Sequence, residues 1–201
     1  LLIFQIFVVL NSGYIAFTNY GTGHNSTKED AISGIMLQNQ ERVPDSAAYP
    51  VSVLQGQGEL LFLVTDPDGD ALIGGTDRPL ENVDDATFEG GKAVGAPGYT
   101  TLDFAGLIAN SEEITQISVP ISDDVNDGML STADGATAYL YTSRYVYDEV
   151  ADTMTDTESG VVFSNIGTGA FTAPDGTEIL PGWQITVGFD NFIRAFTEPS
   201  I

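Results

Sequence analysis

The sequence contains no cysteine, one histidine and one tryptophan, and only six of its 201 residues are lysine or arginine. Without cysteine the chain can form no disulfide, no thiol nucleophile and no cysteine-ligated metal site. The single histidine, His24, excludes a zinc site with two histidines, and it lies in a stretch of glycine, asparagine, serine and threonine. No glycine-rich loop is followed by Lys-Ser/Thr, so a phosphate-binding loop is also absent. We therefore expect a protein that is not an enzyme.

Basic residues are few, whereas acidic residues are abundant. The chain has 29 aspartates and glutamates and a formal net charge of −23. Such a surface repels nucleic acid and anionic lipid headgroups, so both are poor partners and no nucleic-acid partner is expected. Hydrophobic residues make up 42% of the chain, enough for a folded core. The charge predicts an extracellular or cell-surface protein of a saline habitat.

The N-terminus is strongly apolar and carries no charge before Lys28. Over residues 1–20 a helix would be about 30 Å long, close to the thickness of a bilayer core. A buried strand is the alternative, because β-branched and aromatic residues are frequent in this stretch. We favour the helix and predict that it mediates assembly through these residues: Leu1, Leu2, Ile3, Phe4, Ile6, Phe7, Val8, Val9, Leu10, Tyr14, Ile15 and Phe17.

An apolar segment at residue 1, with no preceding methionine, resembles the N-terminus of archaeal type IV pilin-like and archaellin-like filament subunits. In that family a short basic leader is removed and the apolar helix becomes the new N-terminus. Gln5 departs from the glutamate that bacterial pilins usually carry at the fifth mature position, so the resemblance is to the archaeal branch. It covers residues 1 to about 25 and implies a filament in which copies of the chain pack through their apolar helices.

A polar joint follows the apolar segment over residues 21–27. It contains the sequon Asn25-Ser-Thr27, which makes Asn25 a candidate glycosylation site. Ser26 or Thr27, followed by Lys28, Glu29 and Asp30, can cap a helix, and apolar residues then recur at helical spacing. The pattern predicts a short helix over about 28–40, which ends before Pro44.

Residues 50–201 have the pattern of a mainly β fold. Segments of β-formers are separated by turns rich in aspartate, glycine and proline, which favours an antiparallel β-sandwich or jelly roll. The sequence thus divides into an apolar segment, 1–25, and an acidic β-rich head, 26–201. Residues 74–98 are polar and are expected to form a loop. The predicted strands are Val51–Leu54, Glu59–Thr65, Thr100–Phe104, Ile114–Ile121, Ala136–Tyr147, Gly160–Ser164 and Gln184–Phe196.

One turn carries a candidate metal site. Asp66, Asp68 and Asp70 alternate along a tight turn, so their carboxylates could converge on Ca²⁺, which prefers oxygen ligands. The position of the EF-hand glutamate is held by Gly75, so a regulatory EF-hand is excluded. The same sequence is also a good turn without any ion. Apart from this candidate Ca²⁺ site, no cofactor is expected.

Together these features predict a structural subunit of an extracellular filament from a halophilic archaeon. Its partners would be copies of itself, and a membrane before assembly. Two alternatives remain open. The first is a jelly-roll coat protein of a halophilic virus, located in the virion. The second is a membrane-anchored surface binding module or enzyme.

Overall fold

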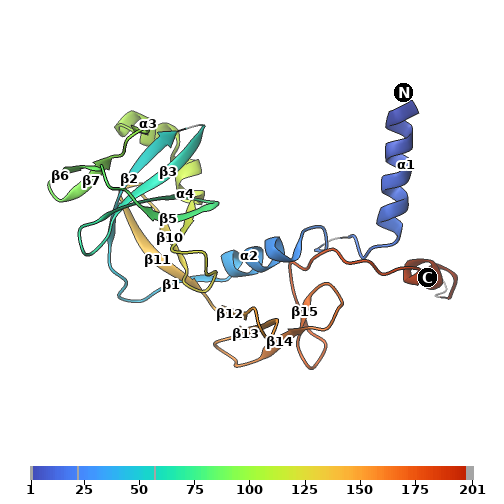
Figure 1. The fold of residues 1–201 in the computed structure, drawn as a ribbon. Coiled ribbons are helices and arrows are strands. Elements are labelled where there is room, and N and C mark those ends of the chain that lie inside the picture. The colour runs from blue at the N-terminus through green and yellow to red at the C-terminus, as the bar shows by residue number, and fades with distance from the viewer. Residues whose placement is uncertain (1, 22, 57, 198–201) are drawn as a thin grey trace. The chain divides into compact units, whose positions relative to one another are not determined.

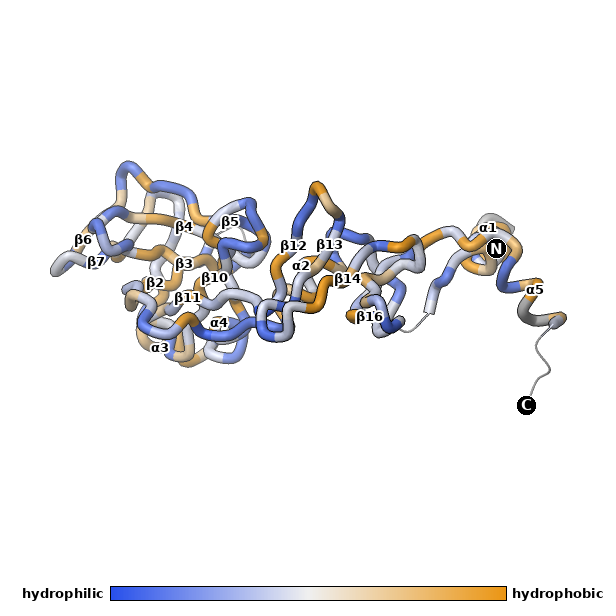
Figure 2. The backbone as a smooth tube through the Cα atoms, turned by 90° about the horizontal axis from the view of Figure 1, so that it is seen from below, coloured by the Kyte–Doolittle hydropathy of each residue, from blue (hydrophilic) through white to orange (hydrophobic). Residues whose placement is uncertain are grey.

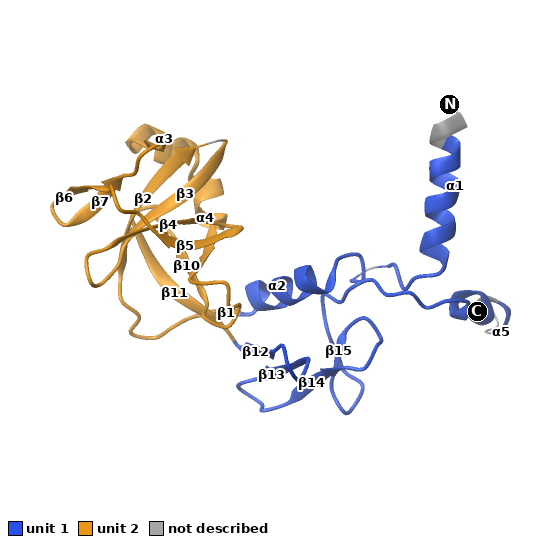
Figure 3. Cartoon of the chain, in the orientation of Figure 1, with its two compact units in different colours: residues 1–39, 144–201 blue, residues 40–143 orange. Residues whose placement is uncertain are grey.

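The computed structural model describes residues 2–21, 23–56 and 58–197. The fold is mainly β, with short helices (Figure 1). The chain divides into two compact units. Unit 1 consists of residues 1–39 and 144–201, and unit 2 consists of residues 40–143 (Figure 3). Unit 2 is therefore an insertion between the two segments of unit 1.

Unit 2 is built on one antiparallel sheet. Seven strands follow one another in the order β5 (Arg78–Asn82), β4 (Ala71–Gly75), β3 (Glu59–Thr65), β2 (Tyr49–Gly56), β11 (Thr137–Ser143), β10 (Met129–Thr132) and β9 (Ser118–Pro120). β1 (Gln40–Arg42) also pairs with β11, and β8 (Thr100–Thr101) pairs with β2. β5 and β9, at opposite ends of this order, lie close together, so the sheet curls into a nearly closed barrel.

β3 is buried on both of its faces. Leu60, Phe62 and Val64 pack into the main core of unit 2, while Leu61 and Leu63 belong to a second cluster on the other face. That second face is covered in part by the hairpin of β6 (Thr87–Glu89) and β7 (Lys92–Gly95). The hydroxyl of Ser52 donates to the carbonyl of Ala93 in this hairpin at 2.8 Å. The uninterrupted apolar sequence of β3 follows from this double burial.

Two short helices, α3 (Phe104–Ala109) and α4 (Ser111–Gln116), precede β9. The strand predicted over Ile114–Ile121 is therefore only half correct, because its first part is the end of α4. The strand predicted over Thr100–Phe104 is shorter than expected and ends at Thr101. The loop predicted over residues 74–98 is wrong, since it contains β5, β6 and β7. Polar residues are tolerated there because these strands are largely half-buried or exposed.

Unit 1 contains a second antiparallel sheet and the remaining helices. Its strands form a curled half-barrel in the order β12 (Tyr145–Asp148), β13 (Thr153–Asp156), β14 (Val162–Asn165), β15 (Phe171–Thr172) and β16 (Glu178–Ile179). α2 (Lys28–Gln38) lies against β12 and buries Ala31, Ile32, Ile35 and Met36. α1 (Leu2–Ala16) and α5 (Asp190–Thr197) complete the unit.

The predicted mainly β, antiparallel fold is confirmed, but the predicted sandwich or jelly roll is corrected to a nearly closed barrel and a curled half-barrel. The strand predicted over Ala136–Tyr147 is interrupted at Arg144, where the chain passes from unit 2 to unit 1. The strand predicted over Gln184–Phe196 is wrong, because its second half is α5. The functional division into residues 1–25 and 26–201 stays a prediction.

Candidate apolar interface

α1 is an apolar helix that exposes its side chains to solvent. Phe7, Val9 and Leu10 are 67, 70 and 68% exposed, and Ile6 and Tyr14 are also exposed. Its hydrophobic residues are coloured orange in Figure 2, and the helix extends away from the half-barrel strands in Figure 1. Exposed apolar side chains on successive turns mark an interaction surface. Among the described residues, no helix has both the length and the apolar character needed to cross a membrane.

The C-terminal end of α1 is held by the C-terminal segment of the chain. The amide of Asn19 donates to the carbonyl of Ile185 at 3.1 Å, and the amide of Val187 donates to the carbonyl of Phe17 at 2.8 Å. The Asn191 side-chain amide donates to the carbonyls of Ala16 and Thr18 at 3.0 and 2.8 Å. The carbonyl of Ala16 belongs to the last turn of α1 and lacks a partner within the helix, so Asn191 acts as its cap. We call residues 16–20 together with 183–193 the terminal junction.

An aromatic cluster joins α1 to α5 at this junction. The ring centroid of Phe17 lies 5.3 Å from that of Phe189 and 5.3 Å from that of Phe192. Phe189 and Phe192 are themselves 6.1 Å apart. These ring distances and angles are those of favourable aromatic pairs. Phe17, the residue after α1, therefore contacts the apolar side of α5.

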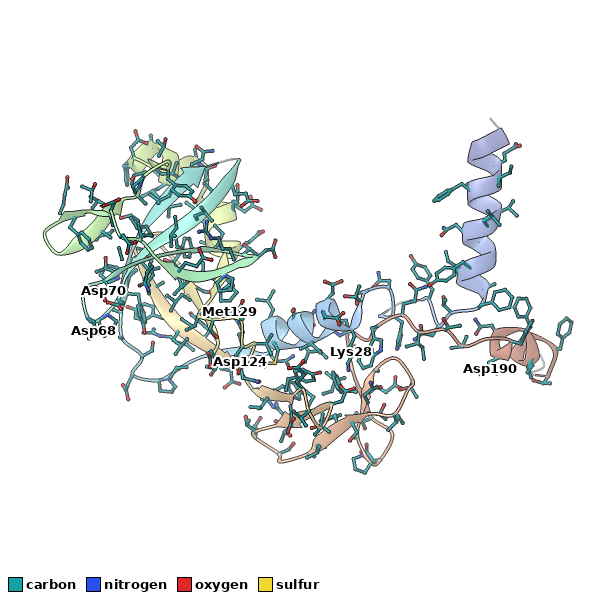
Figure 4. The ribbon with its side chains drawn as sticks, viewed as in Figure 1. Lys28, Asp68, Asp70, Asp124, Met129 and Asp190 are labelled. Atoms are coloured by element: carbon teal, nitrogen blue, oxygen red, sulfur yellow. The ribbon has the colours of Figure 1, made fainter. Side chains whose placement is uncertain are left out.

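Lys28 connects the start of α2 to the half-barrel through an acidic and an aromatic residue. The Lys28 ammonium lies 2.6 Å from both carboxylate oxygens of Asp152, and 5.7 Å from the centroid of the Trp183 ring. The side-chain amide of Asn165 donates to Asp152 at 2.8 Å. Burial opposes ionisation of Asp152, but these hydrogen bonds outweigh it and lower the pKa of the carboxyl. Lys28 is labelled in Figure 4.

A second ion pair lies at the start of β12. The Arg144 guanidinium donates to both carboxylate oxygens of Asp156 and lies 2.8 Å from a carboxylate oxygen of Glu158. The hydrogen bond from Arg144 lowers the pKa of the Asp156 carboxyl and raises the pKa of the guanidinium. The first pair connects α2 to the half-barrel, and the second connects the start of β12 to β13.

The predicted assembly residues occupy two environments. Leu2 to Leu10, Tyr14 and Ile15 are on α1, whereas Phe17 packs against α5; Leu1 lies outside the described residues. The predicted role in assembly is not tested by this arrangement. The sequence analysis missed Asn191 and the apolar face of α5. The spacing of Phe189, Phe192 and Phe196 at intervals of three and four residues could have shown that face.

The candidate calcium residues form a turn in unit 2. A carboxylate oxygen of Asp66 accepts the amides of Asp68 and Asp70 at 2.9 and 2.8 Å, so this oxygen serves the turn itself. Asp68 and Asp70 are labelled in Figure 4. In the part of the chain that the structure describes, no group of three His, Asp or Glu side chains is arranged to hold a metal ion. The calcium site stays a prediction, as does glycosylation of Asn25, which is exposed.

Comparison with known proteins gives one family match. Residues 1–77 match the model described as the N-terminal of TM subunit in PBP-dependent ABC transporters. The match begins with α1 and ends in the turn between β4 and β5. No curated protein matches the chain.

This match contradicts the resemblance to archaeal pilins and archaellins and the filament function drawn from it. An apolar N-terminal helix followed by a polar joint is a weak pattern, which a transporter subunit and a filament subunit can share. Gln5 was already a departure from the bacterial pilins. The halophilic, homopolymeric filament subunit is therefore wrong. The coat-protein and surface-module alternatives depended on the same apolar segment and are set aside with it.

Proposed function

We propose that the chain acts in PBP-dependent ABC transport, as the N-terminal part of a membrane subunit. One observation carries the proposal: the exposed apolar helix α1 lies in the stretch that matches the transporter family model. Exposed apolar surface on consecutive helical turns favours burial against other apolar groups, at about 25 cal/mol for each Å² removed from water. The proposal assigns no reaction to the chain.

In this proposal α1 packs among the membrane-embedded helices of the transporter and enters the apolar layer without crossing it. Its 15 residues correspond to a length of about 22 Å at about 1.5 Å per residue. The barrel and the half-barrel lie on the water-exposed side, at the cell surface. The net charge of −23 supports this placement, because it disfavours close approach of these units to anionic headgroups.

Site-specific photo-crosslinking in the source cells tests the proposal. A photoreactive residue replaces Val9 on α1, and the control replaces Val150, which is 99% exposed in the turn between β12 and β13. The Val9 variant should crosslink to membrane-embedded components of an ABC transporter, whereas the Val150 variant should not. Crosslinks from Val9 only to other copies of this chain would contradict the proposal, as would the absence of the chain from the membrane fraction.

A further inference from the structure

α5 has a uniform apolar face. Phe189, just before the helix, and Phe192, Ile193 and Phe196 within it are spaced at i, i+3, i+4 and i+7, which places them on one side. Their exposed fractions are 69, 40, 56 and 88%. The other side is polar and includes Asn191, the cap of α1. Three phenylalanine rings exposed on one side, two of them on the helix, favour an apolar environment for that side.

The location of α5 relative to α1 is fixed by contacts at the terminal junction. Asn191, in the first turn of α5, donates to the carbonyl of Ala16, the last residue of α1. Phe17 packs against Phe189 and Phe192 directly beside this bond. The apolar face of α5 therefore begins where α1 ends, and Phe17 connects the two helices.

We propose that α5 is an interfacial membrane helix, which lies in the headgroup layer at the depth where α1 leaves the apolar phase. The inference rests on the proposed function, because that function puts α1 into a membrane. Helices of this kind combine a strong amphipathic character with phenylalanine or leucine on the buried face, and they lie in the plane of the interface.

The composition of the face favours lipid over a protein partner. Protein interfaces are enriched in aromatic residues, methionine and arginine, and they also carry about one hydrogen bond for every 100–200 Å². Phe189, Phe192 and Phe196 have no side-chain hydrogen-bonding group, and a lipid surface requires none. The sequence of residues 190–197 contains one acidic and one basic residue, while the whole chain carries −23. Apolar burial rather than attraction to anionic lipid would therefore drive the contact, and zwitterionic phosphatidylcholine is the matching surface.

Spin labels on single cysteines test the depth of each helix. The sequence has no cysteine, so each label occupies one known position. The variants are Phe196→Cys on α5, Val9→Cys on α1 and Val150→Cys as the water-exposed control. In phosphatidylcholine vesicles, the label at 196 should be more accessible to oxygen than to a water-soluble nickel chelate. The label at 150 should show the reverse.

The two labels on the helices separate this inference from the proposed function. If the label at 9 is immersed and the label at 196 stays in water, α5 is not interfacial and the inference is overturned, although the function stands. If the label at 9 stays in water, the proposed insertion of α1 fails. Dipolar broadening at position 196 without vesicles would show that a second copy covers this face, which also overturns the inference.

Vesicle flotation measures how much the face contributes to binding. Ile193→Gln with Phe196→Gln should weaken binding to phosphatidylcholine vesicles by at least about tenfold, since each residue loses most of its transfer free energy. The matched control, Val150→Gln with Ile166→Gln, removes two exposed apolar residues from the half-barrel turns and should leave binding unchanged. Circular dichroism melts verify that both variants are folded. Equal binding by the two variants would contradict the inference.

Discussion

Gly167 and Gly169 have the same backbone conformation in different surroundings. Both have a φ of +86°, which L-residues rarely adopt. A Cβ at Gly169 would collide with the side-chain amide of Asn19 and would lie 2.6 Å from the carbonyl oxygen of Trp183. No described atom lies within 4 Å of a Cβ at Gly167. Both positions therefore favour glycine because of their positive φ, and Gly169 also leaves no room for a Cβ.

We predict that Gly167→Ala lowers the free energy of unfolding by about 1 kcal/mol and Gly169→Ala by about 3 kcal/mol. Urea unfolding followed by the fluorescence of Trp183, the single tryptophan, measures both in unit 1. Gly167→Ala is the matched control, because it carries the same backbone strain without the collision. Equal losses would show that the contact between Gly169 and Asn19 is not formed.

The pair between Lys28 and Asp152 should make the stability of unit 1 depend on pH. The pKa of Asp152 is lowered in the folded state, so its contribution is complete above the usual aspartate pKa of about 3.9 and is lost as pH falls through the folded value. Lys28→Met should reduce the free energy of unfolding at pH 7 by about 1–2 kcal/mol, since both partners are partly exposed.

Urea unfolding between pH 7 and pH 2 provides the measurement. The stability of the Lys28→Met variant should fall less over the acidic range than that of the original chain. Arg78→Met is the matched control, because Arg78 and Glu81 form a more exposed pair in unit 2. That variant should change stability by less than about 0.5 kcal/mol. Parallel acid profiles for the Lys28→Met variant and the original chain would contradict the prediction.

At the scale of elements, the start of α2 is set by a local signal. The Thr27 hydroxyl accepts the amide of Asp30 at 3.1 Å, and the Asp30 carboxylate accepts the amide of Thr27 at 3.3 Å. This reciprocal arrangement is a capping box. Since the Thr27 hydroxyl satisfies one of the first amides of the helix, Thr27→Ala should destabilise unit 1 by about 1 kcal/mol in urea unfolding.

Thr115→Ala is the control for Thr27→Ala, because Thr115 is an exposed threonine within α4 that caps no amide. Its effect should be within about 0.5 kcal/mol. A loss for Thr27→Ala no larger than this would mean that α2 is stabilised by its packing alone.

Local patterns therefore predicted some elements well. Thr27 and Asp30 gave the start of α2, and the apolar sequence Glu59–Thr65 gave β3 without error. α5 was missed because Ile185, Val187 and Phe189 alternate as in a strand, although they lie in the junction segment before the helix. The strands β5 to β7 were missed because their sequences are polar and their pairing depends on the barrel around them.

Of the candidate interface, the sequence predicted α1 but not the terminal junction, because the junction also depends on long-range contacts. α1 is apolar in its own sequence, whereas the terminal junction depends on residues far apart in the chain. Asn191 and Ala16 are separated by 175 positions, and Lys28 and Asp152 by 124. No local spacing rule connects such pairs, so the sequence predicted the helix and not the segment that holds it.

At the scale of the whole molecule, charge is distributed unevenly. Unit 2 has 18 acidic and 3 basic residues, a net charge of −15. At 0.01 M salt the Debye length is about 30 Å, so these charges repel one another across the unit. We predict that the melting temperature rises with NaCl, with most of the rise between about 0.01 and 0.2 M, where screening changes most. Calorimetry measures this, and a flat response over that range would contradict it.

The insertion of unit 2 between residues 39 and 144 has a mechanical consequence. Residues 16–20 and 183–193 both belong to unit 1, and hydrogen bonds join them at the terminal junction. Tension applied between these two segments is carried first by the bonds of the junction, in parallel with the covalent path through the barrel. Gln40 and Ser143, the first and last residues of unit 2, are opposite each other in the pairing of β1 with β11. Tension should therefore reach the barrel only after unit 1 has unfolded. We therefore expect the bonds of the junction to break before the barrel is stretched.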